Sequence, residues 1–175
     1  MLQWSTFESG EILFRPENQQ VDQLLDGVVE LLSGIAARKS IKLTAIPNPG
    51  ATVRADHAMI HSVVQNLVGN ALKFTGKNGT ITLSSRSLGD WIEISVADSG
   101  VGMSRQTLDR ILNRAAGNTT CGTEGETGTG LGLNLSQGFL DKHGGKLQGE
   151  SEVGRGTTFR FMLPRAQPLA TIQDA

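Results

Sequence analysis

The sequence predicts an α/β (α+β) two-layer sandwich, in which a mixed, mostly antiparallel sheet packs on three helices. Two observations predict this class: apolar residues recur at helical spacing over 21–38 and 56–74, and short alternating stretches lie between and after these helices. A third is composition, because 38% of the 175 residues are hydrophobic, enough for one core. The chain has 22 glycines, and 14 of them lie in residues 100–156, which indicates loops shaped around something.

The elements are expected in a simple order along the chain. A weakly alternating stretch that ends at Pro16 predicts a first short strand. Asp56 and Ser104 are each expected to cap the helix that follows them. A turn is expected at 47–50, and a tighter one at 88–90 closes a hairpin. The expected helices cover 21–38, 56–74, 104–112 and 131–143, and the expected strands cover 11–15, 41–46, 52–54, 80–86, 91–97, 146–151 and 157–163.

Composition excludes several classes of function. Sixteen basic and seventeen acidic residues leave a net charge of -1, which gives no electrostatic case for binding nucleic acid. A single cysteine excludes an internal disulfide and a cysteine-based zinc site, and it favours a reducing compartment. No apolar run approaches the ~20 residues of a membrane helix, and the first residues are no signal peptide. We therefore expect a cytoplasmic location.

The helix over 56–74 carries two different arcs. Its polar arc holds Asn66, Asn70 and Lys73, with Phe74 at the margin. Such an arc is usually a solvent face, but asparagine is a mediocre helix former, and exposed faces favour Glu and Lys. The helix alone leaves a solvent face and a binding site equally open. The apolar arc consists of Ile60, Val64, Leu67, Val68 and Ala71.

Two glycine-rich loops flank regular elements. The loop 98–102, Asp-Ser-Gly-Val-Gly, follows a strand, and the loop 128–132, Gly-Thr-Gly-Leu-Gly, precedes a helix. The second supplies backbone N–H groups at a helix N-terminus, which favours phosphate. It is no dinucleotide fingerprint, because no strand–loop–helix unit contains it, and the chain has no GKS or GKT of a P-loop. Taken singly, both loops are also compatible with ordinary turns.

The ordered combination is more specific than its parts. The segments DHAMIHSVVQNLVGNALKFT, DSGVGM and TGTGLGL, with a polar glycine-rich stretch before the last, resemble the ATP-binding catalytic domain of sensor histidine kinases. That family shares the Bergerat ATPase fold with gyrase, Hsp90 and MutL. The resemblance implies that 1–14 is the remnant of a dimerisation helix and its connection, 15–165 the catalytic domain, and 113–130 a mobile ATP lid. We expect a flexible tail over 166–175.

The resemblance also implies a site for Mg-ATP. It implies that Asn70 binds Mg²⁺, that Asn66 and Lys73 are the catalytic residues at the phosphates, and that Asp98 accepts a hydrogen bond from the adenine amino group. A bond to a charged group is worth ~1.5–3 kcal/mol, enough to select adenine over guanine. The other nucleotide-binding residues that it implies are Phe74 against adenine, Gly100 and Gly102 beside the base, and Gly128, Thr129, Gly130, Leu131 and Gly132 in the loop that closes on the phosphates.

One position bears on the reaction. In the gyrase-like hydrolases, a glutamate one turn before the metal asparagine activates water, whereas Asn66 cannot accept a proton at neutral pH. The resemblance therefore implies transfer of the γ-phosphoryl group to a histidine of a dimerisation domain outside this chain, in two-component signal transduction. A response regulator receiver domain is the implied downstream partner. The full-length protein is expected to be a homodimer, cytoplasmic or the cytoplasmic part of a membrane-bound sensor, and this chain a monomer.

Two alternatives stay open. The stretch 111–116 lacks the phenylalanines common in this family, which is compatible with a regulatory domain that binds nucleotide without catalysis. An anti-sigma-type serine kinase of the same superfamily is disfavoured by the helix remnant at the N-terminus. His57, His61 and His143 are poor candidates for a phosphoacceptor, because the first two begin the motif helix. His143 stands at a helix C-terminus, where a cation complements the dipole.

Overall fold

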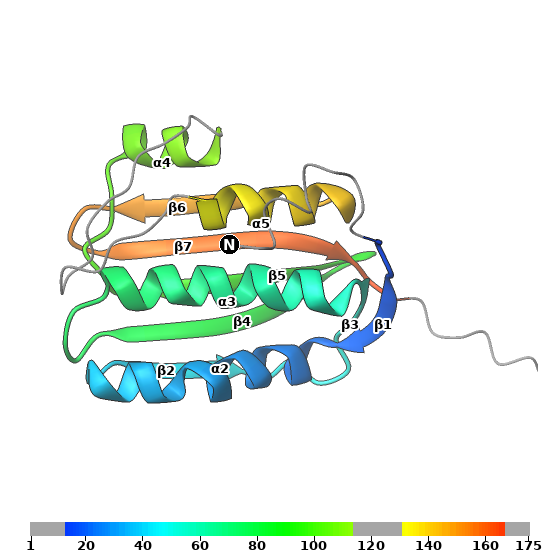
Figure 1. The fold of residues 1–175 in the computed structure, drawn as a ribbon, viewed down its shortest axis with the longest axis horizontal. Helices are drawn as coiled ribbons and strands as arrows, with labels where there is room; N and C mark the ends of the chain where they lie inside the picture. Colours follow the sequence, from blue (N-terminus) through cyan, green and yellow to red (C-terminus); the bar gives the residue numbers. More distant parts are fainter. Residues whose placement is uncertain (1–12, 114–130, 167–175) are drawn as a thin grey trace, which may run out of the picture.

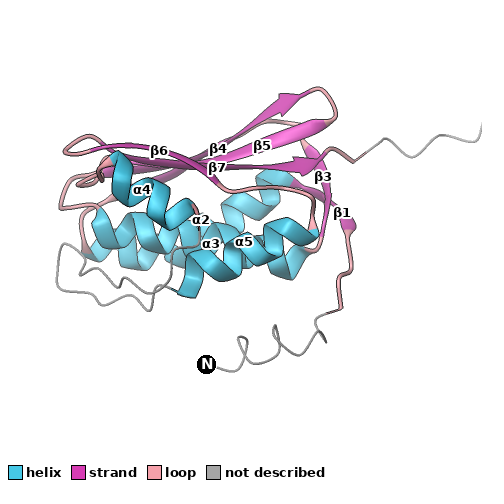
Figure 2. Ribbon diagram, turned by 90° about the horizontal axis from the view of Figure 1, so that it is seen from above, coloured by secondary structure: helices cyan, strands magenta, loops and turns pink. Residues whose placement is uncertain are grey.

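The computed structural model describes residues 13–113 and 131–166. Three helices lie side by side on one side of a five-stranded sheet, so the predicted two-layer sandwich is confirmed (Figures 1 and 2). A fourth, short helix, α4 (Arg105–Leu112), lies beside the edge strand β6. The three helices of the layer are α2 (Val21–Arg38), α3 (His57–Phe74) and α5 (Leu131–Lys142), with α3 in the middle.

The main sheet is mixed. Its strand order is β2-β4-β5-β7-β6, in which β2 runs parallel to β4 and every other neighbouring pair is antiparallel. A separate two-stranded antiparallel sheet pairs β1 with β3. The strands are β1 (Glu17–Gln20), β2 (Lys42–Ile46), β3 (Thr52–Ala55), β4 (Thr80–Leu88), β5 (Trp91–Asp98), β6 (Gln148–Glu152) and β7 (Gly156–Pro164).

The core lies between the helical layer and the sheet. Alternate residues of β4, β5 and β7 face the helices, as the two-residue period of a strand requires. The apolar arc predicted on α3 is confirmed, because each of its five residues is at most 4% exposed. The largest fully buried side chains are Phe161, Leu24, Leu25, Ile60, Leu67, Ile81, Leu83, Ile92, Ile94, Leu140, Leu163 and Val21.

Local signals position the helices well. The carboxylate of Asp56 accepts a hydrogen bond from the backbone N–H of Met59 at 3.1 Å, which confirms the predicted N-cap of α3. The hydroxyl of Ser104 accepts from the N–H of Thr107 at 3.2 Å and caps α4 in the same way. The predicted hairpin between β4 and β5 is also present, closed by the Leu88–Trp91 pair.

The strand prediction was wrong at two places. Residues 13–15 are irregular, and β1 begins only at Glu17. Proline lacks an N–H group and has a fixed φ, so Pro16 is better placed before the ladder than inside it. The strand predicted over 146–151 begins at Gln148. The two strands on either side of the turn at 47–50 do not pair with each other, because β2 joins the main sheet and β3 joins β1.

The ends of the described chain are held by hydrogen bonds. The N–H of Arg15 donates to the carboxylate of Asp56 at 2.9 Å, and the N–H of Ala166 donates to the carbonyl of Thr52 at 2.8 Å. Ala166 is buried and bonded, so the prediction of a flexible tail is wrong at residue 166. The remaining tail, the segment 1–12 and the lid beyond Asn113 lie outside the described residues. Among the helices that are described, none is long and apolar enough to cross a membrane.

Candidate functional site

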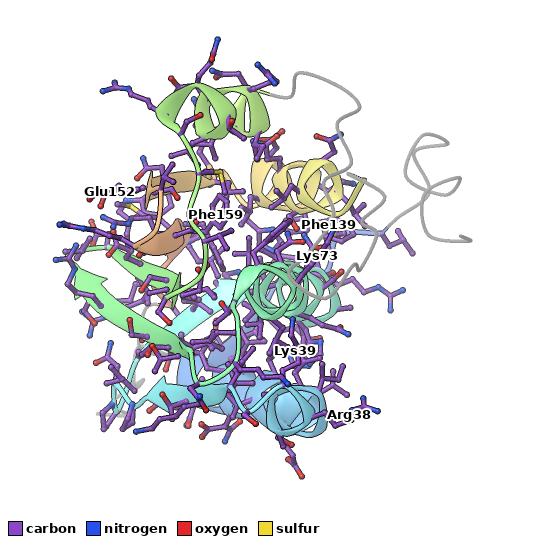
Figure 3. All side chains as sticks on the ribbon, turned by 90° about the vertical axis from the view of Figure 1, so that its left-hand side faces the viewer. Arg38, Lys39, Lys73, Phe139, Glu152 and Phe159 are labelled. Atoms are coloured by element: carbon purple, nitrogen blue, oxygen red, sulfur yellow. The ribbon has the colours of Figure 1, made fainter. Side chains whose placement is uncertain are left out.

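The polar arc of α3 is partly buried. Asn66, Asn70, Lys73 and Phe74 all have intermediate exposure, whereas a solvent face would leave such side chains open to water. In Figure 3, Lys73 lies on the side of α3 that faces α5. Its ammonium nitrogen is 5.0 Å from the centroid of the Phe74 ring, within the range of a cation–π contact. The polar arc is therefore partly covered by neighbouring parts of the protein and is not an open solvent face.

The C-terminal end of α3 meets the loop that follows β5. The N–H of Val101 donates to the carbonyl of Phe74 at 3.0 Å, which satisfies one of the last carbonyls of the helix. A Cβ atom at Gly100 would lie 2.8 Å from Oδ1 of Asp98 and 2.9 Å from the carbonyl carbon of Phe74. Only glycine fits at this approach, and it brings the loop that carries Asp98 against the end of α3 at Phe74.

The carboxylate of Asp98 is held on one side only. Its Oδ1 accepts hydrogen bonds from the N–H of Gly100 at 2.8 Å and from the N–H of Thr157 at 3.2 Å. Within residues 13–113 and 131–166, Oδ2 has no hydrogen-bond partner. Burial raises the pKa of Asp98 above its ordinary 3.8, and the two N–H groups oppose that rise. The result is a fixed, partly buried carboxylate with one oxygen left to accept from a ligand.

The other glycines here pack against the protein itself. Gly102 has φ +63, and a Cβ atom there would collide with the carbonyl of Glu152 in β6. Gly156 has φ +102, and a Cβ atom there would collide with the carbonyl of Asp98. Gly102 therefore joins the loop to the β6–β7 turn, a role in packing that accompanies the binding role predicted for it.

Asn66 contacts α5. Its Nδ2 donates to the hydroxyl of Ser136 at 3.0 Å. A Cβ atom at Gly132 would lie 2.8 Å from Cγ of Asn66, so the predicted site residues Asn66 and Gly132 do meet. The side chain of Asn70, one turn further along α3, makes no hydrogen bond to the part of the chain described here.

The asparagine side chains of α3 suit Mg²⁺ that is bound together with phosphates better than a metal ion that is held by protein side chains alone. The described residues contain no group of three or more His, Cys, Asp or Glu side chains able to hold a metal ion. Mg²⁺ keeps several waters, takes oxygen ligands and is commonly bound through one or two side chains together with substrate phosphates. The amide oxygen of Asn70 is of the right type for such a site.

Three useful residues escaped the sequence analysis. Thr157 comes 59 residues after Asp98, and its role depends on the pairing of β5 with β7, for which no local signal exists. Lys39, only 6% exposed, donates from Nζ to the carbonyl of Leu72 at 2.8 Å and lies between α2 and α3 (Figure 3). Ser136 follows Gly132 by one helical turn, so helical spacing could have found it.

His143 corrects a prediction. Its Nε2 accepts from the N–H of Asp56 at 2.9 Å, and its Nδ1 donates to the carbonyl of Phe139 at 2.6 Å. This pattern requires the neutral imidazole, and burial lowers the pKa of His143 below its ordinary 6.5. The predicted cation at the helix end was therefore wrong, because the ring is enclosed and bonded as a neutral group.

The other two histidines begin α3. His57 is exposed, and its Nδ1 lies 2.9 Å from the side-chain oxygen of Gln19. Burial, and after it the charge of His57, lowers the pKa of His61. Of the remaining predicted site residues, Gly128, Thr129 and Gly130 lie outside the described residues, and Leu131 begins α5.

The surface also has a cavity, which lies away from the candidate site. A cavity of about 780 Å³ opens between α5 and the edge strand β6. Its lining includes Gln137, Asp141, Lys146 and Arg160, and none of the predicted site residues that the structure describes. The candidate site is thus defined by its chemistry and its close backbone approaches, and this cavity has no part in it.

Comparison with known proteins places the chain. A family model described as "Histidine kinase-, DNA gyrase B-, and HSP90-like ATPase" matches residues 55–167. The chain belongs to this family. Among curated relatives of this ATPase domain, histidine protein kinase DivJ of Caulobacter vibrioides is 36% identical over 143 residues, which cover 81% of this chain and 24% of DivJ.

Solved structures agree with the domain assignment. The structure of full-length ShkA in complex with AMPPNP has a TM-score of 0.80 and 28% identity, over 95% of this chain and 35% of that chain. The histidine kinase ThkA, in complex with the response regulator protein TrrA, has a TM-score of 0.77 and 25% identity, over 94% of this chain and 46% of that chain. The predicted Bergerat fold of histidine kinase catalytic domains is confirmed. This ATPase domain spans less than half the length of each of these relatives.

Proposed function

We propose that this domain binds Mg-ATP and donates its γ-phosphoryl group to a histidine on a separate dimerisation domain. The observation that carries the proposal is the carboxylate of Asp98. Two backbone N–H groups fix its Oδ1, and its Oδ2 is left to accept from an exocyclic amine. Adenine offers such a donor, whereas guanine presents a carbonyl oxygen at the same position and is repelled.

The other residues of the candidate site suit the same nucleotide. The partly exposed ring of Phe74 is tied to the Asp98 loop through the Val101 N–H and gives an apolar surface for the base. Lys73 directly precedes Phe74 in the sequence and supplies a cation for the phosphates. Asn70 and Asn66 follow the same face of α3 toward α5, where they would hold Mg²⁺ and the phosphates. When bound, Mg²⁺ neutralises phosphate charge during transfer.

The position of Asn66 favours transfer over hydrolysis. An amide cannot take a proton from water at neutral pH, so the residue one turn before Asn70 is no general base. Its Nδ2 is moreover bonded to Ser136. A site that holds ATP without activating water is suited to an acceptor brought in from outside.

The acceptor is expected on another domain. His143 is buried and bonded on both ring nitrogens, and His57 and His61 lie at the opposite end of α3 from Asn70 and Phe74. AMPPNP in ShkA and the response regulator bound by ThkA support ATP as donor and a receiver domain as the next partner. We place this reaction in the cytoplasm, within a homodimer of the full-length protein.

Calorimetric titration tests the nucleotide. ATP is expected to bind measurably, and GTP much more weakly; equal affinities would contradict the role of Asp98. The variant Asn70→Ala is expected to lose the dependence of ATP affinity on Mg²⁺. Its unfolding free energy should stay within about 0.5 kcal/mol of the wild type, because the side chain has no described partner to lose.

Labelled γ-phosphate tests the transfer. The isolated chain should neither hydrolyse ATP at an appreciable rate nor label itself, and a dimerisation domain added in trans should acquire acid-labile label. ATP binding with no transfer to any such domain would favour a regulatory nucleotide-binding domain. Acid-stable label on serine would favour the serine kinase instead.

A further inference from the structure

The amide of Asn66 is enclosed in a notch on α5. Gly132 and Ser136 are four residues apart, so they lie on the same face of that helix, one turn above the other. The Asn66 side chain approaches the Cα of Gly132 and donates from Nδ2 to Oγ of Ser136 at 3.0 Å. Ser136 is only 2% exposed. The contact between α3 and α5 is therefore buried at Ser136 and partly exposed at Asn66 and Gly132.

The notch orients the amide as well as holding it. A Cβ atom built at Gly132 would meet Oδ1 of Asn66 first, then Cγ, and Nδ2 only at 3.0 Å. The oxygen thus lies toward Gly132, at the beginning of α5, and the nitrogen lies toward Ser136. In the flipped orientation the NH₂ group would lie against the Cα of Gly132, and Oδ1 would accept from the Ser136 hydroxyl, so the oxygen would no longer face the first turn of α5. With Nδ2 donating to Ser136, as the structure has it, the oxygen stays toward the first turn of α5.

We propose that Ser136 is a positioning residue, which sets the amide of Asn66 so that its oxygen is available at the phosphate and magnesium end of the site. The inference rests on the proposed function, because it assigns that end of the site to Mg-ATP. Ser136 itself is expected to touch neither nucleotide nor metal. Partners that orient a metal-binding or phosphate-binding group act in this way, and their loss weakens metal affinity.

The first test uses the nucleotide-free protein. The side-chain NH₂ resonances of Asn66 should shift in the variant Ser136→Ala, because the bond at Nδ2 is lost. The matched control is Ser95→Ala, which also removes a serine hydroxyl from a pair, with Ser84 at 2.8 Å, but in the sheet. Unchanged Asn66 resonances in Ser136→Ala would overturn the inference whatever the protein binds.

The second test is a double-mutant cycle on ATP affinity. Ser136→Ala should lower affinity about tenfold in Mg²⁺ and leave affinity in EDTA unchanged. In an Asn66→Ala background the same substitution should have no further effect, because the group that it positions is absent. Ser136→Cys, which keeps a weak acceptor of similar shape, should restore part of the loss.

The outcomes separate the inference from the proposed function. Equal losses in Mg²⁺ and EDTA, or additive losses in the cycle, would make Ser136 a packing residue and overturn the inference while ATP binding stands. A wild-type protein that binds no ATP in either condition would overturn the proposed function, and the inference with it.

Discussion

Each end of α3 has an aspartate nearby, and the two carboxylates differ in how completely the protein satisfies them. At the N-terminal end, the carboxylate of Asp56 accepts from the N–H groups of Met59 and Arg15, and its own N–H donates to His143. At the C-terminal end, Asp98 uses one carboxylate oxygen and leaves the other, and Asn70 has no described partner. The described protein supplies hydrogen bonds to both carboxylate oxygens of Asp56, the closed end, but to only one oxygen of Asp98, the open end.

This difference distinguishes a structural role for Asp56 from a binding role for Asp98. A buried polar group that lacks a hydrogen bond is costly, so proteins satisfy nearly all of them. A network that is complete within the chain, as around Asp56, needs no ligand and holds the fold. A carboxylate that is fixed but half satisfied, as at Asp98, keeps one oxygen for solvent water or for a bound ligand. The predictions below disturb one end at a time.

The largest effect is expected at the glycine contacts of the open end. Gly102→Ala should lower the unfolding free energy by about 2–5 kcal/mol, from about 1–2 for the left-handed backbone and about 1–3 for the collision with Glu152. Gly50→Ala is the control, because Gly50 has φ +83 but nothing within 4 Å of an added Cβ. It should cost only the backbone part. Denaturant unfolding measures both, and equal costs would show that the close approach is not rigid.

Asp98→Asn should separate binding from folding. An asparagine can keep the bonds from Gly100 and Thr157 through its oxygen, but it presents an NH₂ group where adenine needs an acceptor. ATP affinity should fall by about 1–3 kcal/mol in calorimetric titration. The unfolding free energy of the nucleotide-free protein should not fall. A large loss of stability with intact ATP affinity would place Asp98 with the closed networks.

His143→Phe should do the reverse at the closed end. The substitution keeps a ring but removes the acceptor of the Asp56 N–H, which should cost about 1–3 kcal/mol of unfolding free energy. The affinity of the folded protein for ATP should change little, because the site lies at the other end of α3. His57→Ala, at an exposed position, should stay within about 0.5 kcal/mol of the wild type.

The smallest effect is a pH dependence of opposite sign at the two ends. Folding lowers the pKa of His143, so the unfolded state binds more protons just below pH 6.5, and the stability that this group contributes is lost as pH falls through that window. Folding raises the pKa of Asp98, so stability falls as pH rises from 3.8 to its folded pKa. Each slope is at most about 1.4 kcal/mol per pH unit.

Urea unfolding across pH checks both signs. The difference in stability between wild type and His143→Phe should shrink as the pH falls below 6.5. Asp98→Asn should change only the more acidic part of the curve. A His143→Phe difference that is constant with pH would mean that His143 is not held neutral.

Local signals in the sequence were enough for the helices. Apolar spacing and the capping residue Asp56 predicted α3 and both of its arcs, because the helical repeat and an N-cap involve residues within a few positions of each other. The same spacing placed Asn66 and Asn70 on the arc that meets α5. Strand partners were harder, since β1 pairs with β3 and β2 with β4 across intervening helices.

The details of the site depend on contacts between distant segments. Thr157 donates to Asp98 only because β7 lies beside β5 in one register, and Ser136 receives Asn66 only because α5 lies beside α3. His143 was taken for a cation because its place at a helix end is visible in the sequence and its enclosure by Asp56 is not. The sequence predicted which residues lie near each other along a helix, whereas the protonation state and the orientation of their side chains depend on tertiary packing.

The short strand β3 has a mechanical consequence. It pairs with β1 on one edge, and at Thr52 and Val53 it also bonds to residues 165 and 166, so the incoming and outgoing chain are fastened to the same strand. In Figure 1 this strand lies at the end of the domain where α3 begins, whereas Phe74 and the Asp98 loop lie where α3 ends. Tension applied through the two ends of the described chain would therefore be borne by the β3 ladder. The candidate site at the other end of α3 lies away from this ladder, so such tension would not act directly on its residues.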